Sequence, residues 1–129
     1  MNRPMTLRSL MTALTLAAAA LVTACSSLPP AQVATDTKVL VGKWEGYAVL
    51  KGGHSREATL QVFDDGSFVS SVSGWPDSRG TVKVADGKYR YHSETRNIGG
   101  TFTLHEGGGE RVLVGLSDDG HSGEYRPGK

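Results

Sequence analysis

The feature that most constrains the fold of this chain is a series of short runs in which apolar and polar residues alternate. After residue 37, no window of about a dozen residues keeps a 3.6-residue apolar period, so the sequence predicts no substantial helix there. Alternation with a period of two predicts strands that have one apolar and one polar face. The eight predicted strands cover residues 39–50, 56–63, 67–73, 80–85, 88–93, 100–105, 110–116 and 121–126.

Short connections between these runs predict that neighbouring strands are antiparallel, because parallel neighbours need long crossovers. The pairs Asp65-Gly66 and Asp86-Gly87 supply the positive φ values of tight hairpins, and residues 107–109, all glycine, serve a third turn. The sequence therefore predicts an all-β domain, an eight-stranded antiparallel up-and-down meander. Closure into a small barrel covers the apolar face and pairs the sheet edges; the alternatives are an open meander and a two-sheet sandwich.

The apolar parity of the predicted strands defines the expected interior. Its bulky members are Trp44, Leu50, Leu60, Phe68, Tyr89, Tyr91, Phe102, Leu104 and Tyr125. An eight-stranded barrel has a lumen that side chains fill or that holds one small ligand. We expect a mostly filled lumen with a narrow pocket at one end, where the small inward residues Ala58 and Ser70 leave room.

The N-terminal segment has the residue order of a secretory signal. Arg3 and Arg8 precede an apolar run over residues 10–22, and the small residues Thr23 and Ala24 follow it. The run has about 13 residues, whereas a helix that crosses a bilayer needs about 20. We therefore expect a signal-peptide helix that is removed, and no permanent membrane span.

The four residues from Val22 to Cys25, VTAC, resemble the lipobox of bacterial lipoprotein precursors. The resemblance implies cleavage before Cys25, a diacylglycerol on its sulfur and a further acyl chain, such as palmitate, on the new amino terminus. Two or more acyl chains anchor a protein to a membrane that it does not span. Ser26 after the cysteine implies the outer membrane, with the domain facing the periplasm. The alternative is an ordinary signal peptide that is cleaved nearby and a free thiol on Cys25. An intrachain disulfide is impossible, because the sequence has one cysteine.

The predicted organisation has three parts. Residues 1–24 form the lipoprotein signal peptide, residues 25–38 a lipidated N-terminus and flexible, disordered linker with two prolines, and residues 39–129 the small β-barrel domain. Two of the 14 lysines and arginines and none of the 13 acids lie in the signal peptide, which leaves 12 basic residues against 13 acidic ones. A nearly neutral domain without a basic tract argues against nucleic acid as a partner.

The first predicted strand opens with Gly42, Lys43 and Trp44, a glycine-x-tryptophan that resembles the opening motif of lipocalins and related calycin barrels. The resemblance implies that a late arginine packs over the tryptophan at the closed end of the barrel. Arg126, near the end of the last predicted strand, is the matching residue. The chain departs from the family in its domain of about 90 residues, its short strands and the lack of a helix after the barrel.

Strand direction sorts the connections into two ends of the predicted barrel. The tight turns lie at one end, and the longer connections at the other end span residues 51–55, 74–79, 94–99 and 117–120. Binding residues tend to lie on loops that a rigid scaffold positions. The candidate rim for a ligand or partner consists of His54, Trp75, Arg79, Arg96, Asn97 and His121.

A short internal echo, GHSRE at 53–57 and GHSGE at 120–124, brings His54 and His121 to this same end. One interpretation is a metal site or a serine and histidine pair, and the other is solvated turn residues. Zinc needs three or four converging ligands, and an enzyme needs a nucleophile with a positioned base. The spacing guarantees neither set, so we expect no metal, no cofactor and no catalytic residue.

These patterns predict a non-catalytic, lipid-anchored lipoprotein of the cell envelope whose barrel binds a small apolar or amphipathic ligand. The alternative is a protein-interaction lipoprotein, an inhibitor or accessory factor of an envelope enzyme. That alternative uses an external apolar area formed by Val39, Val41, Tyr47, Val49 and the strand at 110–116. A cavity of roughly 300 Å³ or more favours the ligand, and a filled lumen favours the protein partner. An enzyme is the third hypothesis.

Overall fold

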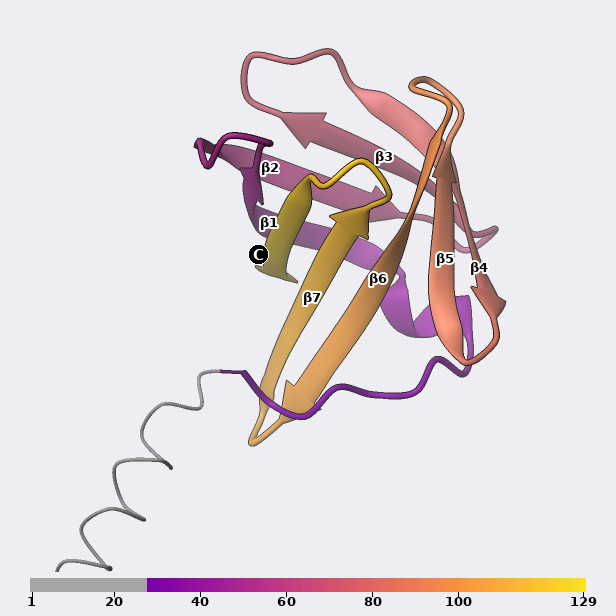
Figure 1. The fold of residues 1–129 in the computed structure, drawn as a ribbon. Coiled ribbons are helices and arrows are strands. Elements are labelled where there is room, and N and C mark those ends of the chain that lie inside the picture. The colour runs from indigo at the N-terminus through magenta and orange to yellow at the C-terminus, as the bar shows by residue number, and fades with distance from the viewer. Residues whose placement is uncertain (1–27) are drawn as a thin grey trace, which may run out of the picture.

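A computed structural model of the protein describes residues 28–129 (Figure 1). The predicted signal peptide and Cys25 lie outside these residues. The strands are β1 (Gly42–Val49), β2 (Ser55–Val62), β3 (Ser67–Val72), β4 (Ser78–Ala85), β5 (Lys88–Ser93), β6 (Ile98–Gly107), β7 (Glu110–Ser117) and β8 (Ser122–Pro127). They follow one another in chain order around a closed barrel, and every neighbouring pair is antiparallel. The predicted up-and-down barrel is confirmed.

The first strand begins later than predicted, whereas the other seven start and end within two residues of their predicted limits. Before β1 the chain forms a short 3-10 helix, η1 (Thr37–Leu40). The Asp36 side chain caps η1 by accepting a hydrogen bond from the Lys38 N–H at 3.0 Å. This turn places Leu40 in the core with no exposed surface. Within residues 28–129, no helix approaches the length and apolar character that crossing a membrane requires.

The turn signals of the sequence appear as predicted at one end of the barrel. In the β4–β5 hairpin, Asp86 and Gly87 have φ values of 53° and 73°, which are those of a type I′ turn. We call this the closed end. The longer connections, over residues 50–54, 73–77, 94–97 and 118–121, lie at the opposite end, which we call the open end.

Inward-facing side chains of the strands form one core. The predicted interior residues that are buried are Trp44, Leu60, Phe68, Tyr89, Phe102, Leu104 and Tyr125. Leu50 and Tyr91 are partly exposed, because both lie toward the open end. The strand β7 adds Leu113, which has no exposed surface.

Trp44 fills the core at the closed end. Its side chain is 2% exposed, and its indole N–H donates to the Leu40 carbonyl at 2.8 Å. The arginine over its ring is Arg111 of β7, whose guanidinium carbon lies 5.2 Å from the ring centre. Arg111 also donates to the Val39 carbonyl at 2.8 Å. These contacts tie β7 to the segment before β1 and cover the tryptophan.

The predicted pairing of Trp44 with Arg126 is wrong. The inward residue of β8 is Tyr125, so Arg126 points outward under strand alternation. Its guanidinium forms exposed ion pairs with Glu124 at 3.4 Å and Glu110 at 3.5 Å. The arginine of β7 lies over the tryptophan instead, because it has the inward parity of its own strand.

The predicted flexible linker is wrong for residues 29–36, which lie against the closed end of the barrel and which we call the N-terminal strap (Figure 1). The strand β6 extends beyond the start of β5, so the backbone groups of its last residues are available for pairing. The strap uses them: the Gln32 N–H donates to the Leu104 carbonyl at 2.8 Å. Ala34 of the strap is buried in the core.

Candidate functional site

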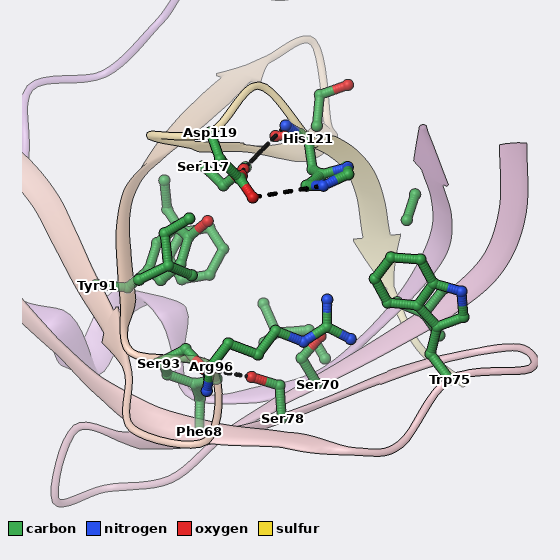
Figure 2. A pocket seen from close by; sticks show the side chains of 18 of the residues that line it. Phe68, Ser70, Trp75, Ser78, Tyr91, Ser93, Arg96, Ser117, Asp119 and His121 are labelled. Atoms are coloured by element: carbon green, nitrogen blue, oxygen red, sulfur yellow. Dashed lines mark hydrogen bonds and ion pairs between the residues drawn. The ribbon is translucent and has the colours of Figure 1, made fainter. Parts of the chain in front are cut away.

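A cavity of about 120 Å³ lies at the open end of the barrel (Figure 2). Its inner wall is apolar and consists mainly of Leu60, Phe68, Tyr91, Phe102 and Tyr125. Its rim carries the polar or charged side chains of Arg96, Ser117, Asp119 and His121, together with Trp75. The wall comes from the strands and the rim mainly from the open-end connections, so the site combines a rigid interior with adaptable edges.

Three aromatic rings from three strands form the inner wall. The rings of Tyr91 and Phe102 are stacked, with centres 4.6 Å apart, and Phe68 packs edge-on against both at 5.8 Å and 6.1 Å. Gly100 makes room for this arrangement, because a Cβ there would overlap the Tyr91 ring. An inward glycine thus lets a tyrosine lie flat against β6 beside the cavity.

The two tyrosines of the wall are uncharged at neutral pH. Burial raises the pKa of Tyr91 to about 12, with smaller contributions from Tyr125 and the acids at the rim. Burial also raises the pKa of Tyr125, and a hydrogen bond with Ser70 opposes that rise. Both hydroxyls are therefore neutral hydrogen-bonding groups on the cavity wall.

A buried serine pair positions the connection between β5 and β6. The hydroxyl oxygens of Ser78 and Ser93 lie 2.6 Å apart, and both side chains are buried. Ser93 Oγ also accepts a hydrogen bond from the Arg96 N–H at 3.2 Å. Asn97 follows with a φ of 52°, a left-handed conformation that asparagine tolerates. The turn places the Arg96 side chain at the mouth of the cavity (Figure 2).

Side chains from three connections meet around the mouth. The guanidinium carbon of Arg96 lies 4.4 Å from the centre of the Trp75 ring, a cation–π contact. The rings of Trp75 and His121 pack edge to face, with centres 6.0 Å apart. These contacts join the connections at 73–77, 94–97 and 118–121 into one continuous rim.

Asp119 is held by two neighbours. Its carboxylate accepts a hydrogen bond from the Ser117 hydroxyl, and it lies 3.4 Å from His121 Nε2. The Ser117 hydrogen bond lowers the pKa of Asp119, and the nearby His121 adds to this shift. The rim therefore carries an ionised carboxylate at neutral pH.

Both ring nitrogens of His121 are engaged. Nδ1 accepts a hydrogen bond from the Lys51 N–H at 3.0 Å, so the proton of the neutral ring is on Nε2, which faces Asp119. The Ser117 hydroxyl lies against the Asp119 carboxylate and the His121 backbone rather than the imidazole. This geometry fixes the rim and does not align a serine with a histidine base in the way that a nucleophile requires.

The structure brings together half of the predicted rim. The predicted rim residues that line the cavity are Trp75, Arg96 and His121. Those that are exposed and do not line it are His54, Arg79 and Asn97. Among residues 28–129, no three His, Cys, Asp or Glu side chains gather closely enough to hold a metal ion, so the two histidines of the echo belong to no such cluster.

Sequence reasoning missed Ser78, Ser93 and Asp119. Ser93 has the same parity as Tyr91 within a correctly predicted strand, so strand alternation could have predicted that its side chain points inward. Ser78 precedes the predicted start of its strand, and Asp119 lies in a connection, where alternation gives no direction.

No protein-family model matches this chain, and no curated protein matches it. A solved structure of a redesigned β-barrel is similar to it over 72% of this chain and 95% of that chain, with 12% sequence identity and a TM-score of 0.47. The barrel architecture described above rests on the strand pairing within this chain.

Proposed function

We propose that this barrel is a non-catalytic binding module that takes a small amphipathic ligand into its open end. The observation that carries the proposal is a cavity with an aromatic inner wall and a polar, charged rim. Ligand sites in proteins are typically apolar pockets with a few placed polar groups. Such a pocket suits a molecule with an apolar body and one polar end.

The size of the cavity limits the ligand. Its volume of about 120 Å³ does not reach the roughly 300 Å³ expected of an ordinary ligand pocket, so the cavity admits only a ligand below the usual size. This volume is close to the ~150 Å³ of an engineered apolar cavity in another protein that holds benzene. The ligand therefore has the size of a single six-membered ring or a short alkyl chain, and its polar end lies among the rim residues.

A titration with benzyl alcohol tests the ligand proposal. The alcohol combines one ring with one neutral polar group, which fits the wall and the rim. We expect NMR signals of Phe68, Tyr91 and Phe102 to shift with a Kd of about 1 mM, equivalent to about −4.1 kcal/mol. This binding free energy lies well within the limit for a ligand of about eight non-hydrogen atoms.

Two serines of β3 provide a matched pair of variants for this titration. Ser70 lines the cavity, so Ser70→Leu fills it and is expected to abolish the shifts. Ser71 has the opposite parity and lies outside the cavity, so Ser71→Leu is expected to leave them. Unchanged affinity in the Ser70→Leu variant contradicts the proposal.

We also propose that acyl chains on Cys25 anchor the protein to the outer membrane, with the barrel facing the periplasm. The support is the lipobox-like sequence VTAC. The strap is tied to the barrel from Pro29 onward, since the Pro29 carbonyl lies 2.9 Å from His105 Nδ1. Four residue steps from Cys25 to Pro29 reach about 14 Å at most. The closed end is then held near the lipid and the open end is directed away from it.

Replacing Cys25 by serine tests the anchor, because serine offers no thiol for acylation. We expect the variant to leave the membrane fraction, and Ser26→Ala to stay in it. Mass spectrometry of the wild-type mature protein is expected to show the added lipid. Unchanged membrane fractionation of the Cys25→Ser variant, with no lipid mass on the wild type, refutes the anchor.

A protein partner is the second candidate function, and the outer surface favours it. Tyr47 of β1 and Leu116 of β7 are 57% and 56% exposed. Val49 and Leu116 both pair in register with Ser122 of β8, so exposed apolar residues of β1 and β7 flank β8 on the outer face. The benzyl alcohol titration separates the two candidates, because shifts confined to this area favour the partner surface.

A further inference from the structure

Arg96 carries a positive charge at the cavity mouth that no described residue neutralises. The ion pairs within residues 28–129 do not include it. Its guanidinium donates no hydrogen bond to any of these residues, and only its backbone N–H is bonded, to Ser93 Oγ. The backbone of Arg96 is therefore fixed in the turn, whereas the N–H groups of its guanidinium have no acceptor among the described residues.

The contact with Trp75 holds this guanidinium without using its donors. The guanidinium carbon lies 4.4 Å from the ring centre, where the aromatic face attracts a cation. A guanidinium over a ring uses its flat face, whereas its five N–H groups lie in its plane. Those donors remain available around the edge of Arg96, which faces the opening in Figure 2.

The carboxylate that lines the cavity, Asp119, is already held by its neighbours. Asp119 and His121 lie 3.4 Å apart, and Asp119 also accepts the Ser117 hydroxyl hydrogen bond. They lie on the opposite side of the opening from Arg96 (Figure 2). An anion that enters the cavity therefore finds one cation without an ion-pair partner and one carboxylate whose contacts are already made with Ser117 and His121.

We infer that the ligand of this cavity is a small carboxylate whose anionic end pairs with Arg96. This inference rests on the proposed function of the cavity as a ligand site. The planar guanidinium matches a carboxylate through two parallel N–H···O hydrogen bonds. The rings of Phe68, Tyr91 and Phe102 hold the apolar body. Aromatic or short-chain monocarboxylates are the class that satisfies both the volume and the charge.

Three probes with one ring and different polar groups test this inference: benzoate, benzyl alcohol and benzylamine. Their affinities are measured by NMR titration. We expect benzoate to bind about tenfold tighter than benzyl alcohol, because hydrogen bonds between charged groups are the stronger class. Benzylamine is expected to bind more weakly than either. Added salt is expected to weaken benzoate binding alone.

Two arginine variants locate the effect. Arg96→Gln is expected to remove the tenfold advantage of benzoate over benzyl alcohol, because the loss of affinity falls mainly on the charged probe. Arg79→Gln is the matched control, because Arg79 is exposed at the open end but does not line the cavity, and we expect wild-type affinities. Arg79 and Arg96 are both exposed, so we expect both variants to fold. Thermal melting of each variant is the check.

The outcomes separate this inference from the proposed function. Equal binding of benzoate and benzyl alcohol, with no effect of Arg96→Gln, overturns the inference and leaves the proposed function standing. Tighter binding of benzylamine than of benzoate also overturns the inference, since it assigns the polar end of the ligand to Asp119. Failure of all three probes to bind overturns both.

Discussion

Replacing Trp44 by alanine is expected to lower the free energy of unfolding by about 3–5 kcal/mol. The side chain is 2% exposed and fills the core at the closed end. Its removal leaves a void and deprives the Leu40 carbonyl of the indole N–H that donates to it at 2.8 Å. Arg111 also loses the ring over which it lies. Small domains are stable by about 5–15 kcal/mol in total, so this loss is a large share.

Urea unfolding followed by circular dichroism measures this loss. Trp75→Ala is the matched control, because Trp75 is the other tryptophan of the chain and is partly exposed at the rim. Its replacement is expected to cost about 1 kcal/mol or less. If the two variants unfold at the same urea concentration, Trp44 does not have the core position described here.

Replacing Gly46 by alanine is expected to destabilise the barrel by about 3 kcal/mol or more, at the upper end of the range for overpacking. Gly46 has the inward parity of β1 and pairs in register with Tyr125 of β8. The two strands approach so closely here that a Cβ at Gly46 would overlap the carbonyl oxygen of Glu124. That neighbour is backbone, so the two strands that close the barrel must move apart.

Gly99→Ala is the control for this prediction. Gly99 lies on the outer parity of β6, and a Cβ there meets the end of the exposed Asp118 side chain at 2.9 Å. Because that side chain can move, we expect a cost of about 1 kcal/mol or less. Thermal unfolding compares the two variants. Similar melting temperatures for Gly46→Ala and Gly99→Ala contradict the close approach of β1 and β8.

The fold was predictable because its signals are local. Alternation marks a strand whatever the strand pairs with, and a pair such as Asp86-Gly87 marks a hairpin through its own φ values. Consecutive hairpins then fix the order of the strands. Closure follows, because an amphipathic meander that pairs β1 with β8 leaves no open edge.

Contacts between distant segments were not predictable in this way. The strap has no alternating pattern, and it pairs with β6 only because β6 extends beyond β5. The arginine over Trp44 was misassigned for a related reason. Arg111 and Arg126 both lie near the closed end, and only the parity of each strand decides which one points inward.

The candidate site was predictable in part. Trp75, Arg96 and His121 lie in long connections at one end of the barrel, and their place in the topology identifies them as rim residues. The hydrogen bonds that fix them involve Ser93 and Asp119. Those bonds depend on side-chain directions within turns, which sequence periodicity does not specify.

The most direct measurement is the intermolecular nuclear Overhauser effect between bound benzyl alcohol and the wild-type protein. We predict contacts from the ring protons of the alcohol to Phe68 and Phe102, on the inner wall of the cavity. Contacts only to Tyr47 and Leu116, on the outer face of the barrel, would contradict a ligand site at the open end.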